Sequence, residues 1–243
     1  MRLFGLIGYP VAHSQSPDYF QQLWTKKGIT DCRYLLFSME NLNELPRLLR
    51  QYPGLQGLNV TSPFKESVLN YADAADECAL RLRSANVLLL RQGKITAFNT
   101  DHLGFDRLLE KCPKLSGAAL ICGTGGAARA VCLSLERHGI QQTVLSRTSG
   151  PDRLQYAMLD GKMLQNYRFI INATPLGMGN FRTECPPLPY EAISSSHILI
   201  DLIYNPSETI FLKKGKAAGC FCLNGLPMLH AQADEAWKIW QRY

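Results

Sequence analysis

The sequence predicts an α/β fold made of two successive α/β units. Short apolar runs alternate with segments of helical spacing along most of the chain. A glycine cluster follows the apolar run at 118–122 and opens the next helical segment. Proline and glycine between residues 113 and 117 separate this second series of strands and helices from the first. These observations favour sheets with parallel strands, covered by helices.

In the first unit, each expected element is bounded by a turn or capping signal. Pro17 suits the first turn of a helix, with Ser16 as its N-cap. Pro63 is expected to open another helix, and Gln92-Gly93 to form the turn of a hairpin. In chain order we expect strands at 3–7, 33–37, 55–60, 85–90 and 95–98, and helices at 17–27, 42–51 and from 63 onward.

The second unit repeats the alternation after a linking helix at 103–112. The helix that follows the glycine cluster is expected to run to His138, because Gly139 is a natural stop. Further strands are expected at 118–122, 143–145, 169–171, 198–202 and 220–223, and a final helix with apolar spacing at 228–240.

Composition limits the classes of partner. The chain has 243 residues, of which 46% are hydrophobic and 19% charged, with a net charge of +6. The basic excess suits an anionic small molecule, and without a Lys/Arg run nucleic acid is not expected. No stretch approaches the roughly 20 apolar residues of a membrane span, and the apolar N-terminal run is too short for a signal peptide. Eight cysteines form no CxxC pair, so we expect reduced thiols, no metal site and a cytoplasmic protein, with monomer and homodimer both open.

A dinucleotide site is predicted at residues 123–128. Gly123, Gly125, Gly126 and Ala127 belong to a G-x-G-x-x-A pattern that follows a strand and opens a helix. Backbone N–H groups at such a helix start can approach a pyrophosphate. The alternative is a glycine-rich turn that binds nothing.

The end of the next strand predicts which dinucleotide is bound. An acidic side chain normally holds the free ribose hydroxyl of NAD about 20 residues after the glycines. Here the chain has Ser146, Arg147 and Thr148, and the nearest acid is Asp152. A guanidinium flanked by hydroxyls suits the 2′-phosphate of NADP, although Arg147 can also be an ordinary exposed side chain.

Two polar clusters follow strands of the first unit. Ser14 and Ser16 are two residues apart, so in an extended segment their hydroxyls point the same way and can hold a carboxylate. Asn59 and Thr61 likewise share a face, and Lys65 falls in the first turn of the helix expected from Pro63, where a cation is disfavoured by the helix dipole. The alternatives are a capping Ser16 and a solvated Lys65.

A third cluster lies near the break between the units. Asp101 comes just after the expected strand at 95–98, and Asn86 lies on the other strand of the same hairpin. Ligands of α/β proteins bind outside the carboxyl ends of strands, so the three clusters outline one polar pocket. The alternative for Asp101 is a helix cap.

Taken in order, these motifs closely resemble those of shikimate dehydrogenases over nearly the whole chain. Ser146 stands where the family more often has asparagine, His102 where glycine is usual, and Val87 where threonine is common. The resemblance covers residues 8–17, 57–65, 86, 99–104, 123–130, 146–148, 172–178, 201–206 and 224–232.

The resemblance implies a two-domain enzyme that reversibly reduces 3-dehydroshikimate with NADPH, on the pathway to chorismate and the aromatic amino acids. It implies a substrate-binding catalytic domain at 1–102, completed by 226–243, and a Rossmann-like NADP domain at 103–225, with the C-terminal helix returning to the first domain. It also implies site residues. Carboxylate ligands would be Ser14 and Ser16; ligands of the ring hydroxyls would be Asn59, Thr61, Lys65, Asn86, Asp101 and Gln232; Tyr204 would lie near the substrate and the nicotinamide. Cofactor residues would be Gly123, Gly125, Gly126, Ala127, Ser146, Arg147, Thr148, Ala173, Thr174, Leu202, Gly225 and Met228.

A ketone reduction needs a hydride on carbon and a proton on oxygen. Lys65 is the expected proton donor and Asp101 its orienting partner, with a possible share in proton transfer. Three rival functions remain open at this point: a quinate/shikimate dehydrogenase with relaxed substrate or NAD use, a non-catalytic protein that binds NADP or shikimate, and a two-domain oxidoreductase acting on folate carbons.

Overall fold

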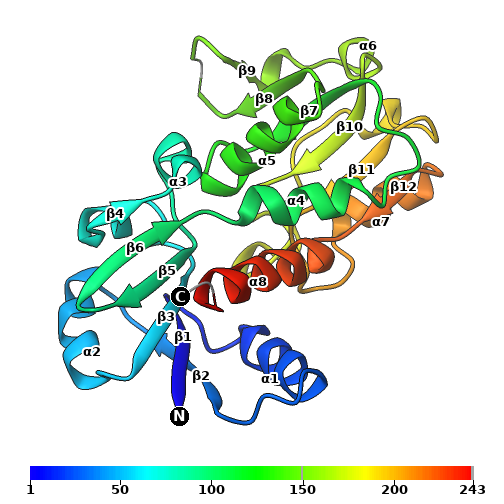
Figure 1. Cartoon of the computed structure of the whole chain (residues 1–243). Helices are drawn as coiled ribbons and strands as arrows, with labels where there is room; N and C mark the ends of the chain where they lie inside the picture. The colour runs from blue at the N-terminus through cyan, green and yellow to red at the C-terminus, as the bar shows by residue number, and fades with distance from the viewer. Residues whose placement is uncertain (149, 242–243) are drawn as a thin grey trace. The chain divides into compact units, whose positions relative to one another are not determined.

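The computed structural model describes residues 1–148 and 150–241 and divides them into two compact units (Figure 1). Unit 1 contains Met1–Thr100 and the chain from Gln232 onward, and unit 2 contains Asp101–Ala231. Helix α8 (Leu226–Gln241) begins in unit 2 and ends in unit 1. The division therefore falls at 100/101 and 231/232, where the sequence suggested 102/103 and 225/226.

Unit 1 contains a mixed six-stranded sheet in the order β2-β1-β3-β5-β6-β4. Strand β1 pairs in parallel with both β2 and β3, whereas β5 runs antiparallel to β3 and β6. The strands are β1 (Arg2–Gly8), β2 (Cys32–Ser38), β3 (Leu55–Val60), β4 (Ala74–Ala75), β5 (Val87–Arg91) and β6 (Lys94–Phe98). The helices are α1 (Ser16–Lys26), α2 (Leu45–Gln51) and α3 (Glu77–Leu82), with 3₁₀ turns at Leu42–Glu44 and Ser67–Tyr71.

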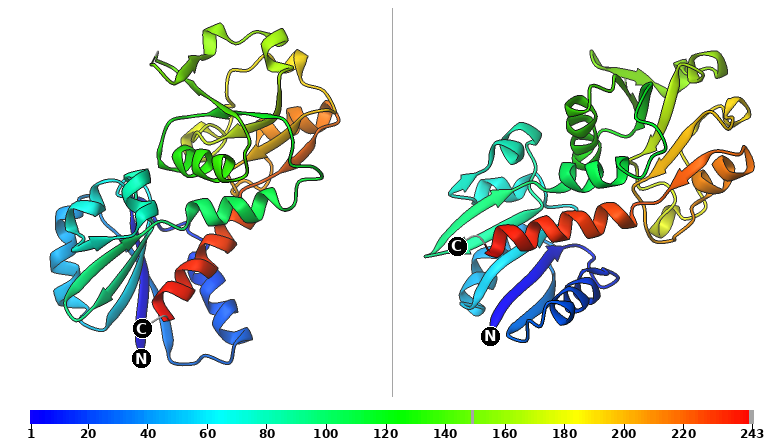
Figure 2. Two further views of the ribbon diagram at one scale, coloured as in Figure 1. Left: turned by 45° about the horizontal axis from the view of Figure 1, so that its top comes forward. Right: turned by 45° about the vertical axis from the view of Figure 1, so that its right-hand side comes forward.

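Both faces of this sheet are covered, as the views in Figure 2 show. One face packs against α2, α3 and the Ser67–Tyr71 turn around Leu58 and Leu88. The other packs against α1 and the end of α8, where Phe4 stacks on Trp240 with ring centroids 4.8 Å apart. Trp237 and Trp240 thus anchor α8 in the core.

Gly57 makes the close packing of α8 possible. A Cβ atom at this position would overlap the indole ring of Trp240, whose Nε1 donates to the Leu88 carbonyl at 3.0 Å. We expect Gly57→Ala to lower the free energy of unfolding by about 2–3 kcal/mol, the usual cost of overpacking a rigid core. Gly54→Ala is the control, because its Cβ would meet Leu3 only at 3.7 Å. Equal unfolding midpoints for the two variants in denaturant titrations would contradict this packing argument.

Unit 2 contains a fully parallel sheet in the order β12-β11-β10-β7-β8-β9. This is a doubly wound Rossmann order, with the direction of winding reversing between β7 and β10. The strands are β7 (Ala118–Cys122), β8 (Gln142–Ser146), β9 (Arg153–Gln155), β10 (Tyr167–Asn172), β11 (Ile198–Asp201) and β12 (Phe221–Leu223). The helices are α4 (Asp101–Leu109), α5 (Gly126–Arg137), α6 (Gly161–Leu164) and α7 (Ile210–Ala217), with 3₁₀ turns at Tyr156–Met158, Gly179–Phe181 and Tyr190–Ala192.

Alternate strand residues of unit 2 enter two separate cores. Ile121 and Ile171 pack with α4, α5 and Met228, whereas Leu120 and Ile170 pack with α6, α7 and the loop at 185–193. Because both faces are buried, the strands read as continuous apolar runs in the sequence. The two layered sheets confirm the predicted α/β fold class.

Several local predictions are wrong. Ser16 is the first residue of α1 and the N-cap is Gln15, which makes no capping side-chain bond. No α-helix begins at Pro63: residues 61–66 form turns that lead to the 3₁₀ turn Ser67–Tyr71. The helix expected at 42–51 is a 3₁₀ turn followed by α2, and the sequence reading missed α3, α6, α7, β4 and β9.

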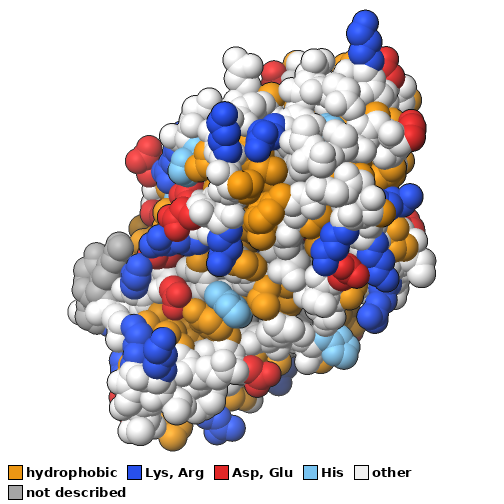
Figure 3. Space-filling model, turned by 90° about the vertical axis from the view of Figure 1, so that its right-hand side faces the viewer, with side chains coloured by type: hydrophobic (Ala, Val, Ile, Leu, Met, Phe, Trp, Pro, Cys, Tyr) orange, Lys and Arg blue, Asp and Glu red, His pale blue; other side chains and the backbone are white. Residues whose placement is uncertain are grey.

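The surface offers no single dominant charge feature on the face drawn in Figure 3, where Lys and Arg side chains stand singly or in small groups. Within the described residues, no helix is both long and apolar enough to span a membrane.

Candidate active site

Strands β1 and β3 place the first two polar clusters together. The two strands are parallel neighbours, so their carboxyl ends share one edge of the sheet. Beyond them, the Thr61 amide donates to the Ile7 carbonyl at 3.0 Å, and the Tyr9 amide donates to the Ser62 carbonyl at 3.0 Å. A Cβ at Gly8 would overlap the Thr61 methyl group, so this close approach requires glycine.

Ser14 and Ser16 do meet, but by a different geometry from the extended one predicted. The chain turns here, because the Ser14 amide donates to the Val11 carbonyl at 3.0 Å. The Ser14 hydroxyl accepts from the Ser16 amide and donates to the Ser16 hydroxyl, both at 3.2 Å. Ser16 is buried, with 7% of its surface exposed. The paired hydroxyls therefore arise from a turn at the start of α1.

Asn59 is the buried link between neighbouring strands. Its Oδ1 accepts a hydrogen bond from the Tyr34 hydroxyl at 2.7 Å, and its Nδ2 donates to the Asn86 carbonyl at 3.3 Å. Tyr34 was not among the predicted site residues. An amide with both ends bonded in a buried setting has one fixed orientation.

Asn86 extends the same network to the C-terminal helix. Its Nδ2 donates to Gln232 Oε1 at 3.1 Å, and its Oδ1 accepts from the Thr100 amide at 2.8 Å. The Thr100 hydroxyl donates to the Gln232 carbonyl at 3.1 Å. Side chains from the loop before β5, the end of β6 and α8 thus converge, although Gln232 is 146 residues from Asn86 in sequence.

Lys65 is tied to the same part of unit 1 through its backbone. It is half-buried, and its carbonyl accepts from the Ala85 amide at 2.7 Å, next to Asn86. Lys65 lies in a turn, so the predicted helix-dipole penalty does not apply. Thr61 is also half-buried. Unit 1 therefore holds seven of the nine predicted substrate residues: Ser14, Ser16, Asn59, Thr61, Lys65, Asn86 and Gln232.

The other two predicted substrate residues belong to unit 2. Asp101 is the first residue of α4 and is 4% exposed. Tyr204 is half-buried in the loop after β11, where desolvation raises the pKa of its phenol.

The glycine turn of unit 2 has the shape of a nucleotide-binding turn. Gly123 adopts a φ of 111°, and a Cβ there would lie 2.9 Å from the Ala173 carbonyl oxygen. Gly125 is the N-cap of α5 with no side-chain cap, it is exposed, and its Cβ would face open space. Gly126 and Ala127 form the first turn of α5. The N–H groups of that turn are therefore open to a bound anion.

The end of β8 carries the predicted phosphate ligands. The Ser146 hydroxyl is buried, accepts from the Thr148 amide at 3.2 Å and lies 3.4 Å from the Thr148 hydroxyl. Between them, the Arg147 side chain is exposed. The glycine turn and Arg147 follow adjacent parallel strands, so the residues present fit a phosphorylated dinucleotide.

A buried carboxylate fixes the loops after β10 and β11. Asp201 Oδ1 accepts from Asn172 Nδ2 at 3.1 Å and from the Ile203 amide at 3.0 Å, while Oδ2 accepts from the Thr209 hydroxyl at 2.6 Å. Asn172 Oδ1 in turn accepts from the Thr174 amide at 3.0 Å. The network holds the predicted cofactor residues Ala173 and Thr174 at the carboxyl edge of the sheet.

The Asp201 network has a testable pH dependence. Burial raises the pKa of Asp201 to about 6, against the three hydrogen bonds that lower it. From about pH 4 to pH 6 the folded chain binds this proton more tightly than the unfolded chain, so the free energy of unfolding falls as pH rises through that window. The rise of the Asp201 pKa from its ordinary value of 3.8 corresponds to about 3 kcal/mol of unfolding free energy across that window.

We therefore expect Asp201→Asn, which cannot ionise, to gain about 2–3 kcal/mol relative to the parent protein between pH 4 and pH 6.5. Urea unfolding of both proteins across this range gives the difference. A stability difference between the two proteins that stays constant with pH would contradict the raised pKa of Asp201.

The remaining cofactor predictions lie around the start of α8. The Leu202 amide donates to the Asn172 carbonyl and the Gly225 amide to the Ile203 carbonyl, each at 3.0 Å. A Cβ at Gly225 would overlap the Leu202 carbonyl, which explains the glycine. Met228 is buried in the core of unit 2.

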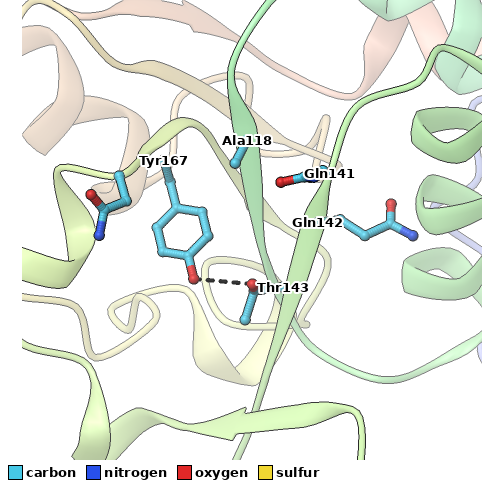
Figure 4. A pocket seen from close by; sticks show the side chains of 6 residues that line it. Ala118, Gln141, Gln142, Thr143 and Tyr167 are labelled. Carbon is cyan, nitrogen blue, oxygen red and sulfur yellow. Dashed lines mark hydrogen bonds between the residues drawn. The ribbon is translucent and has the colours of Figure 1, made fainter.

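A polar hollow also lies at the opposite edge of this sheet (Figure 4). It is lined at the amino ends of β7, β8 and β10, where the Tyr167 hydroxyl donates to the Thr143 hydroxyl at 3.0 Å. Ligands of doubly wound sheets bind at the carboxyl ends, so this hollow is not the candidate site. Across the described residues no group of three or more His, Cys, Asp or Glu is placed to hold a metal ion.

Comparison with known proteins identifies the family of the chain. Residues 6–88 match the model of the shikimate dehydrogenase substrate binding domain. A protein named shikimate dehydrogenase (NADP(+)) from Pyrococcus abyssi is 34% identical over 249 residues, which cover 99% of this chain and 92% of the relative. The chain belongs to the shikimate dehydrogenase family. This confirms the resemblance seen in the motifs.

Solved structures of the shikimate dehydrogenase family match the whole chain. The Thermus thermophilus enzyme, described in complex with NADP(H) and shikimate, aligns with a TM-score of 0.89 and 31% identity over 100% of this chain and 94% of its own. The Aquifex aeolicus enzyme aligns with a TM-score of 0.88 and 32% identity over 99% of this chain and 92% of its own.

Tyr34 and Asp201 belong to these networks but were not among the predicted site residues. Tyr34 reads as one more apolar strand residue, and nothing local indicates that its hydroxyl reaches Asn59. Asp201 ends an apolar run with no distinctive neighbour. An acid at the end of a buried strand is the one signal that could have singled out Asp201.

Proposed function

We propose that this member of the shikimate dehydrogenase family catalyses the reversible NADPH-dependent reduction of 3-dehydroshikimate to shikimate. The proposal is carried by the polar side chains of unit 1, in which Asn59, Asn86 and Gln232 are linked by hydrogen bonds and Ser14 bonds Ser16. The chain also resembles family members named as NADP-dependent over nearly its full length. Such a cluster of hydroxyl and amide groups suits a small polyhydroxylated carboxylate.

Unit 1 would bind the substrate. The Ser16 hydroxyl can donate to a carboxylate, and the Ser14 hydroxyl can rotate away from the Ser16 oxygen to do the same. The amides of Asn59, Asn86 and Gln232 can exchange hydrogen bonds with ring hydroxyls. Rigid, mutually bonded side chains orient a ligand at a lower entropic cost than free ones.

Unit 2 would bind NADP through the turn at Gly123, the N-terminus of α5 and the end of β8. In this proposal the N–H groups after Gly125 face the pyrophosphate, and Arg147, Ser146 and Thr148 take the 2′-phosphate. Ala173, Thr174, Leu202, Gly225 and Met228 line the cofactor along β10, β11 and α8.

Lys65 and Asp101 would carry out the proton transfer. The cofactor, when bound, supplies the hydride. The Lys65 ammonium stabilises the negative charge that develops on the carbonyl oxygen and donates a proton to that oxygen. In the reverse direction the neutral amine accepts the proton. The Asp101 carboxylate orients the ammonium and a ring hydroxyl, and shares in the proton transfer.

The assignment of a substrate domain at 1–102 with 226–243, and of an NADP domain at 103–225, forms part of this proposal. We also propose a cytoplasmic enzyme that acts as a monomer or homodimer. All eight cysteines are free thiols, which suits a reducing compartment.

Initial rates of nicotinamide reduction test this function, with shikimate and quinate each combined with NADP and NAD. We expect the largest kcat/KM for shikimate with NADP. Comparable rates with quinate or NAD would replace the substrate or cofactor assignment by the relaxed quinate/shikimate alternative. No turnover in any pair by folded protein would contradict the enzyme and favour a binding protein.

A further inference from the structure

Tyr34 joins strand β2 to the proposed substrate cluster. It lies on β2, the edge strand of the unit 1 sheet, and its hydroxyl donates to Asn59 Oδ1 at 2.7 Å. Asn59 in turn donates through Nδ2 to the Asn86 carbonyl at 3.3 Å. The phenol therefore bonds a residue that is proposed to bind a ring hydroxyl and that is itself bonded to a second such residue.

The phenol ring is itself held in place. It stacks on Phe20 with ring centroids 4.6 Å apart and an interplanar angle of 15°. Phe20 is a buried residue of α1, so the ring that carries the hydroxyl is packed against that helix.

The bond of this hydroxyl has a fixed direction. A phenol has one hydrogen, which goes to Asn59 Oδ1. Asn59 then cannot rotate its amide without losing an acceptor, and its Nδ2 uses one hydrogen for the Asn86 carbonyl. The second Nδ2 hydrogen remains to be offered to a ligand oxygen.

We propose that Tyr34 is a positioning residue that holds the Asn59 amide in the orientation in which it binds a hydroxyl of the substrate. The inference rests on the proposed function. Phenylalanine would fill the same space and keep the stack on Phe20, so the hydroxyl accounts for the choice of tyrosine. Tyr34 acts through Asn59 and takes no part in the transfer of hydride or proton.

The test is Tyr34→Phe, which removes the hydroxyl and keeps the ring. We expect KM for shikimate to rise about five- to tenfold, which is the size of one lost hydrogen bond, with kcat and KM for NADP each changed by less than about twofold. Tyr71→Phe is the matched control, because the Tyr71 hydroxyl also donates to an asparagine Oδ1, that of Asn43, at 2.7 Å in the same unit. It should leave both KM values unchanged.

A double-mutant cycle separates positioning from general destabilisation. Asn59→Ala should raise KM for shikimate less in the Tyr34→Phe background than in the parent, because the phenol no longer orients the Asn59 amide. Fully additive effects, an unchanged KM in Tyr34→Phe, or parallel losses in kcat, KM for NADP and unfolding temperature would overturn the inference.

The outcome is distinguishable from failure of the proposed function. Turnover of shikimate by the parent with a normal KM in Tyr34→Phe overturns only the role of Tyr34. If the parent shows no turnover, the proposed function fails, and shikimate titrations by calorimetry of the parent and Tyr34→Phe take over the test. Weaker shikimate binding by Tyr34→Phe than by Tyr71→Phe would then support the inference, and equal or absent binding would overturn it.

Discussion

Replacement of Lys65 by methionine is expected to lower kcat for shikimate oxidation about a thousandfold, within the range known for loss of a positioned acid–base group. Methionine retains most of the aliphatic stem and lacks the amine. KM for shikimate should change less than about threefold, because the interaction lost develops mainly in the transition state. Steady-state rates with saturating NADP measure both constants.

Lys94→Met is the control for Lys65→Met. Lys94 is the exposed first residue of β6 in the same unit, so its loss should leave kcat unchanged. If Lys65→Met retained more than about a tenth of the parental kcat, the proton-transfer role would be wrong, since that role supplies at least about a hundredfold.

Arg147→Ala is expected to weaken the preference for NADP over NAD. Loss of a charge-assisted contact to the 2′-phosphate should lower kcat/KM for NADP about 10- to 100-fold. The value for NAD should stay within about twofold, because NAD has no phosphate at that position. The ratio of the two specificity constants is the readout.

Arg182→Ala is the control for Arg147→Ala, since Arg182 is an exposed arginine of the same unit that belongs to the segment after β10 and not to the end of β8. It should leave the ratio unchanged. An equal loss for NADP and NAD in Arg147→Ala would show that the side chain supports the nucleotide site in general and does not read the phosphate.

The strands were largely predictable because their signals are local. Residues 55–60 and 118–122 are strands with the predicted bounds. The second is a continuous apolar run ended by Gly123, and the first has apolar residues at 55, 58 and 60 before the polar Thr61. The hairpin was predictable for the same reason: Gln92 and Gly93 have φ values of 50° and 74°, and the pair is a recognisable turn sequence.

The missed helices had weaker but readable signals. Asp76 caps α3 through the Ala79 amide at 2.7 Å, and Thr209 caps α7 through the Leu212 amide at 3.3 Å. Both are ordinary N-cap types before short apolar segments. The helix expected at Pro63 failed for a tertiary reason, because the Lys65 carbonyl bonds to Ala85 instead of continuing a helical ladder.

The candidate site was predictable as a list of residues and much less as a geometry. Hydroxyls and amides at strand ends indicated Ser14, Asn59 and Asn86, because those positions share a sheet edge. Their partners are distant in sequence: Tyr34 is 25 residues from Asn59. A single sequence contains no signal for such contacts, which depend on how helices and strands pack.

The most direct test of the central claim is the product formed from 3-dehydroshikimate and NADPH that carries deuterium in place of both hydrogens at carbon 4 of the nicotinamide. Mass spectrometry should find one product, shikimate, that carries a single deuterium at carbon 3. That result would establish both the substrate and the direct hydride transfer. Unchanged 3-dehydroshikimate after incubation with folded enzyme, or shikimate without deuterium, would contradict the account.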